Sequence, residues 1–182
     1  MNIIYEPEED SYLLKEVLEN KIPLFLKKNP DLKLLEIGVG SGIQLKTALN
    51  SGVNKDNISG VDINHDAVVC CKNLGFNCID SNLFSKVLGR YEVIIFNPPY
   101  LPLDKDEPKD SMLITTGGKK GSELINKFLI QSKNHLSSEG KIFLLVSSLT
   151  KGIKWNNYKK KIVAKKKIFF EELKVYELSL GK

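Results

Sequence analysis

Short apolar segments with the character of strands alternate with amphipathic segments along most of this 182-residue chain. Strands are predicted at 34–37, 58–63, 76–79, 92–96 and 141–146, and helices at 43–50, 65–74 and 122 to about 136. A helix between two strands forms a βαβ crossover, and repeated crossovers build a mostly parallel sheet with helices on both faces. Ligands of such α/β sheets bind at the carboxyl ends of the strands, so functional residues are expected there.

The two ends of the chain complete this organisation. Proline and acidic residues at 6–11 suit the first turn of a helix whose apolar stripe includes Leu13 and Val17. Later in the chain we expect a loop at 101–120, a short helix near 155–163 and strands near 168–170 and 173–180.

The composition is that of an ordinary globular protein, with 42% hydrophobic and 27% charged residues. A chain of this length supports one core, so residues 1–182 are expected to form a single domain. No apolar run approaches the roughly 20 residues of a membrane span, and the acidic start lacks the basic region of a signal peptide. We therefore expect a cytoplasmic protein without membrane contact. Cys70, Cys71 and Cys78 form no CxxC pair and are expected to be small core residues, which argues against disulfides and a metal site.

The net charge of +5 is unevenly distributed, because eight lysines lie between Lys151 and Lys167. Such a run could hold phosphates. A solvated face is the favoured interpretation, since nucleic-acid sites prefer arginine and the chain has a single arginine, Arg90.

A glycine-rich turn follows the first predicted strand, where the chain runs from Glu36 through Gly38 and Gly40 to Gly42. Glycines at alternate positions allow a sharp turn and a close approach of the backbone to a ligand. Asp62 ends the second strand about 20 residues later, where a carboxylate can accept both hydroxyls of a ribose. The combination favours a nucleoside cofactor over a purely structural turn.

The type of nucleoside follows from charge. The turn lacks the lysine of a phosphate-binding P-loop, and its acidic surroundings would repel a pyrophosphate. The same acidic residues suit a cofactor that carries an ammonium and a sulfonium, which indicates S-adenosylmethionine.

The fourth strand ends in the sequence Asn97-Pro98-Pro99-Tyr100. An amide or aromatic amino nitrogen is a poor nucleophile because its lone pair is delocalised. Two acceptors placed on its N–H bonds, the Asn97 side-chain oxygen and the Pro98 carbonyl, would orient it and stabilise the transition state. Prolines stiffen such a loop, and Tyr100 offers a flat face to a planar group. A structural, proline-stiffened strand exit is the alternative.

These segments, in this order and at these spacings, resemble the HemK-type glutamine methyltransferases, in particular their short archaeal and eukaryotic branch. The resemblance rests on YEPEEDSYLL at 5–14, EIGVGSG at 36–42, VDI at 61–63, IIFNPPYLP at 94–102 and GGKKG at 117–121. It implies the Rossmann-like class I S-adenosylmethionine-dependent methyltransferase fold, with a seven-stranded sheet whose last strand is antiparallel. It also implies that 1–31 form a cofactor-capping helical segment before a core at 32–182.

The resemblance assigns site residues as well. Those implied to bind the cofactor are Ser11, Glu36, Gly38, Gly40, Asp62, Asn82, Leu83 and Asn97, and those implied to be catalytic are Asn97, Pro98 and Tyr100. Asn82 stands where relatives usually have an aspartate that accepts from the adenine amino group. Asp80 could substitute for it, although position favours Asn82 with Leu83.

The implied reaction is methylation of the side-chain amide nitrogen of the GGQ glutamine in a class I translation release factor. The implied partners are that release factor and a small zinc-binding activator subunit, with nucleic acid involved only indirectly. The main alternative is an RNA or DNA amino methyltransferase acting on adenine N6 or guanine N2, because NPPY is shared with such enzymes. A protein lysine methyltransferase and an inactive cofactor-binding scaffold also remain open.

Overall fold

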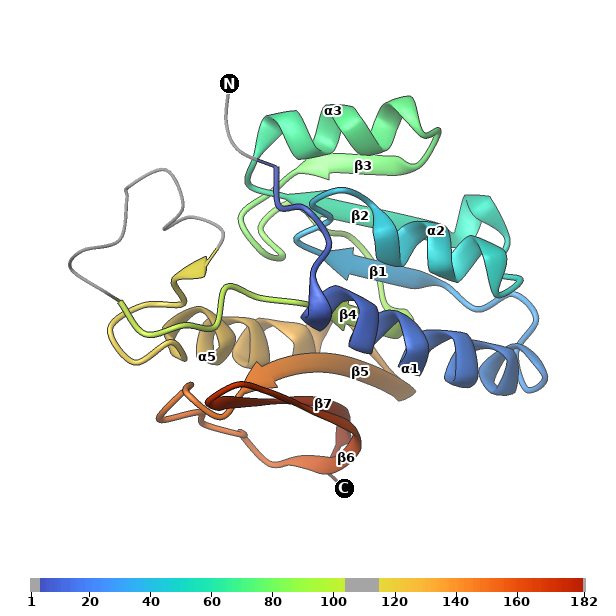
Figure 1. Cartoon of the computed structure of the whole chain (residues 1–182). Coiled ribbons are helices and arrows are strands. Elements are labelled where there is room, and N and C mark those ends of the chain that lie inside the picture. Colours follow the sequence, from blue (N-terminus) through green and yellow to red (C-terminus); the bar gives the residue numbers. More distant parts are fainter. Residues whose placement is uncertain (1–3, 104–114, 182) are drawn as a thin grey trace.

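A seven-stranded mixed sheet forms the centre of the protein in the computed structural model, which describes residues 4–103 and 115–181 (Figure 1). Its strands are β1 (Leu34–Ile37), β2 (Ile58–Asp62), β3 (Asn77–Asp80), β4 (Tyr91–Phe96), β5 (Leu136–Ser147), β6 (Tyr158–Ile168) and β7 (Glu171–Leu180). The order across the sheet is β3-β2-β1-β4-β5-β7-β6. Neighbours from β3 to β5 are parallel, and β7 runs antiparallel to both β5 and β6. The predicted parallel sheet with an antiparallel last strand is confirmed.

Helices cover both faces of this sheet, as predicted. They are α1 (Glu9–Leu26), α2 (Ile43–Asn50), α3 (His65–Asn73) and α5 (Glu123–Gln131), with short 3-10 turns at Lys55–Asn57 and Ser132–Asn134. Residues of α1, α2 and α3 share one buried cluster, and residues of α5 belong to the other. Alternate residues of a strand point to opposite faces, so Val93 and Ile95 of β4 join the first cluster and Ile94 and Phe96 the second.

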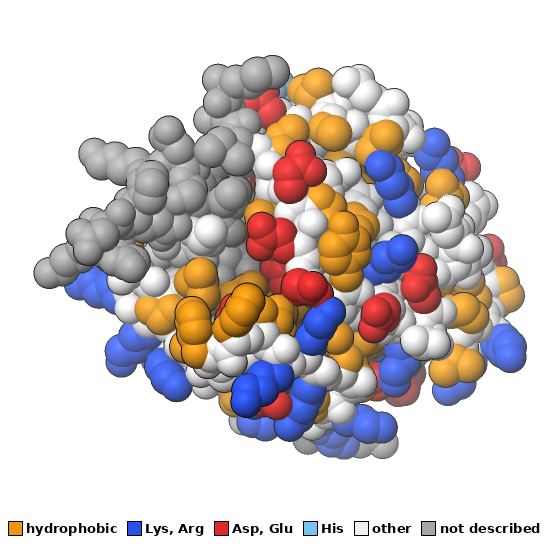
Figure 2. Space-filling model, in the orientation of Figure 1, with side chains coloured by type: hydrophobic (Ala, Val, Ile, Leu, Met, Phe, Trp, Pro, Cys, Tyr) orange, Lys and Arg blue, Asp and Glu red, His pale blue; other side chains and the backbone are white. Residues whose placement is uncertain are grey.

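The predicted short helix near 155–163 is wrong, because Tyr158–Ile168 is strand β6 at the edge of the sheet. Lysine and alanine favour helices, and the charged residues hide the alternation of a strand. The strand is nonetheless well placed, since Val163, Ala164 and Ile168 pack against the core while its lysines are exposed. Lysines on an edge strand hinder pairing with other chains, which gives this charge run a structural role. Figure 2 shows Lys and Arg side chains gathered on the lower part of the molecule, where β6 and β7 lie in Figure 1.

Other boundaries differ by a few residues. The predicted helix at 122–136 ends at Gln131, and β5 begins at Leu136, ahead of the predicted 141. The strand expected near 173–180 is part of β7, whereas the strand expected near 168–170 is wrong, because Ile168 ends β6 and Phe169 and Phe170 form the turn that leads into β7. Much of the loop expected at 101–120 lies outside the described residues.

Cys71 and Cys78 are buried and Cys70 is half-buried, and all three are free thiols, in agreement with their predicted role as small core residues. None of the described helices combines the length and the apolar character needed to cross a membrane.

Candidate functional site

A cavity of about 610 Å3 opens at the carboxyl ends of the parallel strands. The register pairs Ile37 at the end of β1 with Val61 of β2 and Phe96 of β4, so the loops that follow these strands are neighbours. All predicted site residues line this one cavity: Ser11, Glu36, Gly38, Gly40, Asp62, Asn82, Leu83, Asn97, Pro98 and Tyr100. Their role in binding and catalysis stays a prediction, whereas their placement together is a structural fact.

The glycine-rich turn after β1 has the sharp backbone conformation expected from its glycines. Gly38, Gly40 and Gly42 have φ angles of 72°, 47° and 78°, in the left-handed region that residues with a Cβ rarely adopt. Asp62 braces the turn, because its Oδ2 accepts a hydrogen bond from the Gly40 N–H at 3.0 Å and its Oδ1 accepts one from Asn64 at 2.8 Å. Burial raises the pKa of the Asp62 carboxyl, and the backbone N–H donors oppose that rise. The carboxyl therefore has a fixed orientation at the cavity wall.

Glu36 is a buried carboxyl with an unused acceptor. Its side chain is 2% exposed and lines the cavity, and its Oε2 has no hydrogen-bond partner among the described residues. Burial raises the pKa of this carboxyl well above its usual value. A buried, unpaired carboxylate is costly, so this site favours a ligand that brings a cation or a hydrogen-bond donor.

Gln44 repeats this pattern on α2. Its Nε2 donates to the Ser11 carbonyl at 2.9 Å, and its Oε1 is buried without a partner in the described part of the chain. This hydrogen bond connects the start of α1 with α2 at the wall of the cavity. Sequence reasoning missed Gln44, because a glutamine on a short helix carries no signal of its own.

Asp10 is the other missed residue, and it joins the N-terminal segment to the NPPY loop. Its Oδ2 accepts hydrogen bonds from the Asn97 Nδ2 at 3.1 Å and from the Tyr100 hydroxyl at 3.4 Å. Its Oδ1 accepts one from the Tyr5 hydroxyl at 2.8 Å. Burial, with a further contribution from the Asp10 charge, raises the pKa of both Tyr5 and Tyr100, so both phenols stay protonated donors. From the sequence, Asp10 was assigned only to the first turn of the helix. Its burial, which would have indicated a role in the site, cannot be read from the sequence.

This network decides which way the Asn97 amide points. Its nitrogen is held by Asp10, with Ser11 Oγ 3.5 Å away, so its Oδ1 is the end left for another group. That oxygen is buried and has no partner among the residues that the structure describes. The Asn97–Tyr100 loop is held by a further hydrogen bond, because the Thr150 hydroxyl donates to the Tyr100 carbonyl at 2.8 Å. A held acceptor beside a proline-stiffened loop can receive an N–H from a substrate.

The cavity continues to Asn82 and Leu83 after β3. Asn82 is exposed, whereas Leu83 is buried with a φ of 51°, and the Ser81 hydroxyl donates to the Leu83 carbonyl at 2.9 Å. Asp80 instead contacts His65, with Oδ1 2.7 Å from the histidine Nδ1. His65 is exposed and is not among the residues that line the cavity.

Comparison with known proteins identifies the family. Residues 11–165 match the family described as methyltransferase small domain. The chain is 40% identical to a putative protein N5-glutamine methyltransferase of Methanocaldococcus jannaschii, over 94% of this chain and 89% of that protein. It is 28% identical to the eRF1 methyltransferase catalytic subunit mtq2 of Schizosaccharomyces pombe, over 81% of this chain and 74% of that protein.

Solved structures agree with the sequences. The fold is similar to that of a chain of the E. cuniculi Mtq2-Trm112 complex, with a TM-score of 0.72, 25% sequence identity and coverage of 97% of this chain and 98% of that one. The chain therefore belongs to the methyltransferase small domain family and, within it, to the HemK-type protein-glutamine N-methyltransferases.

Proposed function

We propose that this protein transfers a methyl group from S-adenosylmethionine to the side-chain amide nitrogen of the GGQ glutamine in a class I translation release factor. The observation that carries the proposal is the Asn97 amide, whose nitrogen is held by Asp10 and whose buried oxygen is left without a partner among the described residues. The M. jannaschii and S. pombe relatives, named for glutamine and eRF1 methylation, support this acceptor.

The cavity residues fit the cofactor. The unpaired Glu36 oxygen and the Gln44 oxygen offer acceptors for the ammonium group of its methionine part, and the glycine turn leaves room beside them. Asp62 would accept from the ribose hydroxyls, and Asn82 with Leu83 would face the adenine. Ser11, on the segment 1–31, would close over the bound molecule. Bound S-adenosylmethionine supplies an electrophilic methyl group on a positively charged sulfur.

The remaining chemistry is orientation of the glutamine amide. Its two N–H groups would donate to the Asn97 Oδ1 and the Pro98 carbonyl, which turns the nitrogen lone pair toward the methyl group. Tyr100 would pack its ring on the planar amide. Methyl transfer would form a bond from this nitrogen to the methyl carbon and would leave the electron pair of the broken carbon–sulfur bond on sulfur. The nitrogen then loses one proton to solvent, so no general base is required.

We propose one domain over 1–182, a cytoplasmic location with the translation apparatus, and a heterodimer with a small zinc-binding activator subunit. The E. cuniculi structure, a complex of Mtq2 with Trm112, supports the partner. Co-expression with the cognate activator should raise the soluble yield and the affinity for S-adenosylmethionine. A chain that is equally soluble and active alone would argue against the partner.

The test of function uses the purified chain, methyl-labelled S-adenosylmethionine and the cognate release factor. Label should appear on the GGQ peptide and be absent when the glutamine is replaced by alanine. Asn97→Ala should abolish labelling, whereas Asn20→Ala, which removes an exposed amide on α1, should not. Label on RNA, on DNA or on a lysine would instead support the alternatives, and an absence of turnover would support the scaffold.

A further inference from the structure

The turn between β6 and β7 carries two exposed phenylalanines. Ile168 pairs with Glu171, so Phe169 and Phe170 form a two-residue hairpin turn, and they are 91% and 86% exposed. Phe169 has a φ of 48°, a conformation that glycine and asparagine adopt at far lower cost than an aromatic residue. Neither hydration nor turn geometry favours phenylalanine here, which points to a role in binding.

This turn lies directly beside the catalytic cavity. Glu171, the residue after Phe170, lines the cavity together with Asn97 and Tyr100. Ser147 of β5 pairs with Leu173 of antiparallel β7, so the turn extends past the carboxyl end of β5, which is the edge of the sheet where the cavity opens. A protein substrate that inserts one side chain into the cavity would place the residues next to that side chain at the turn.

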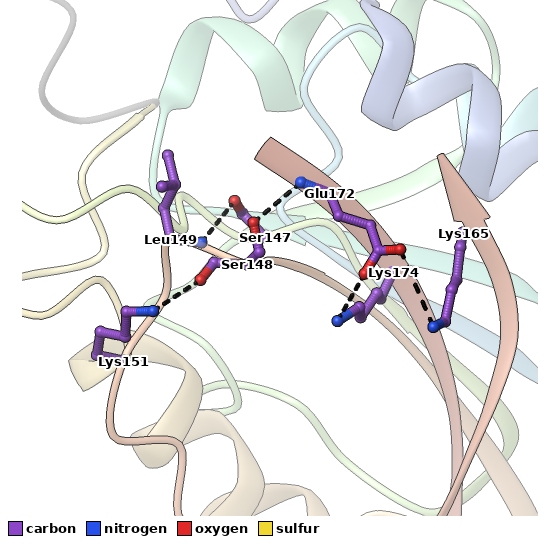
Figure 3. A network of polar contacts seen from close by, with 7 residues as sticks. All are labelled: Ser147, Ser148, Leu149, Lys151, Lys165, Glu172 and Lys174. Atoms are coloured by element: carbon purple, nitrogen blue, oxygen red, sulfur yellow. Dashed lines mark hydrogen bonds and ion pairs between the residues drawn. The ribbon is translucent and has the colours of Figure 1, made fainter. Parts of the chain in front are cut away.

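The turn is also held in place. The Ser148 hydroxyl accepts a hydrogen bond from the Glu172 N–H at 2.9 Å, and the Ser147 hydroxyl accepts one from the Leu149 N–H at 3.1 Å (Figure 3). Glu172 is held further by Lys174, whose Nζ lies 2.7 Å from its Oε2. Since the Thr150 hydroxyl of this loop binds the Tyr100 carbonyl, the turn and the NPPY loop share one support.

We propose that Phe169 and Phe170 form a docking surface for the protein that carries the methyl-accepting glutamine, and that they contact apolar side chains next to that residue. The inference rests on the proposed function and names the part of this chain that selects a protein substrate. Exposed aromatic residues are frequent anchors of protein interfaces.

Charge favours a protein over a nucleic acid at this place. Of the lysines before the turn, Lys166 pairs with Glu9 and Lys165 lies 4.0 Å from Glu172, so their charges are partly neutralised. The cavity rim adds the acidic residues Glu8 and Glu171, which would repel phosphates. Figure 2 shows hydrophobic side chains gathered between the lysine-rich lower edge and acidic side chains above it.

The test compares steady-state methylation of the intact release factor and of a short GGQ peptide. The double variant Phe169→Asn, Phe170→Ser suits the turn better than the natural pair and should fold with an unchanged or higher Tm. Its KM for the release factor should rise about ten-fold or more, while kcat, the Kd for S-adenosylmethionine and activity on the peptide stay within about two-fold. Leu88→Ser is the matched control, because Leu88 is 85% exposed and precedes β4 at the opposite end of the sheet.

Each other outcome decides against the surface in a distinct way. An unchanged KM in an otherwise active enzyme overturns the docking role and leaves the proposed function intact. If the natural chain is a dimer and the double variant is a monomer, the turn serves self-association. If the natural chain binds RNA in a salt-sensitive way and the double variant does not, the turn serves binding of nucleic acid. If the natural chain does not methylate the release factor at all, the proposed function itself fails.

Discussion

The Asp10 Oδ2 lies 3.1 Å from the Asn97 side-chain nitrogen, and the two residues are 87 positions apart in the sequence. This single contact orients the amide that the proposed mechanism depends on. A carboxylate only accepts hydrogen bonds, so it selects the amide nitrogen and leaves the Asn97 oxygen for the substrate.

The first prediction concerns the substitution Asp10→Asn, which removes the preference of residue 10 for the amide nitrogen of Asn97. In Asp10→Asn, the new side chain can donate as well as accept, so the Asn97 amide loses its preferred orientation. We expect kcat to fall about 100-fold, the size of effect seen when one oriented polar group of an active site is lost, with a much smaller change in KM. Single-turnover measurements with saturating substrate check this, and the control is Asp31→Asn, which changes an exposed carboxylate. A kcat equal to that of the natural chain would show that Asp10 does not position Asn97.

The contrast between Asp10 and Asn97 shows how far sequence reasoning reaches. Asn97 and Asp62 were predicted because each lies at the end of its own strand, and the parallel order of β2, β1 and β4 brings such strand ends together. Asp10 comes from a helix before the sheet, and its contact with the NPPY loop depends on how α1 packs. That packing is set by many apolar contacts rather than by a local motif, so no spacing in the sequence reports it.

Strand β6 was missed for a different physical reason. This edge strand pairs only with β7, and its lysines are exposed, so it has no alternation of buried and polar residues to recognise. The neighbouring β7 has a short stretch of this pattern, with Leu173 and Val175 buried at alternate positions, and it was predicted. Edge strands are therefore the part of this fold where local composition is least informative.

The second prediction decides which residue faces the adenine. Asn82 lines the cavity, whereas Asp80 contacts the exposed His65. We expect Asn82→Ala to raise the Kd for S-adenosylmethionine about three- to ten-fold, the usual worth of one neutral hydrogen bond, and Asp80→Ala to leave it unchanged. Isothermal titration calorimetry of the two variants checks this. A weaker affinity in Asp80→Ala alone would reverse the assignment.

The third prediction concerns Glu36 and pH. Burial raises the pKa of this carboxyl above its value of about 4.3 in an unfolded chain, so the folded protein binds the proton more tightly than the unfolded one. The stability from this group is therefore complete below about pH 4 and is lost as the pH rises toward the raised pKa. Glu36→Gln, which stays neutral, should then match the natural chain at low pH and exceed it in Tm at pH 7 in the absence of ligand.

The same substitution should have the opposite effect on binding. A cationic ligand favours the ionised form of Glu36, so S-adenosylmethionine should bind with release of a proton, and Glu36→Gln should weaken binding about ten-fold or more. Thermal unfolding from pH 4 to pH 8, and calorimetric titrations in buffers of different ionisation enthalpy, measure the two effects separately. A variant that is less stable at pH 7 and binds the cofactor as tightly would show that Glu36 is a structural residue rather than a ligand of the methionine ammonium.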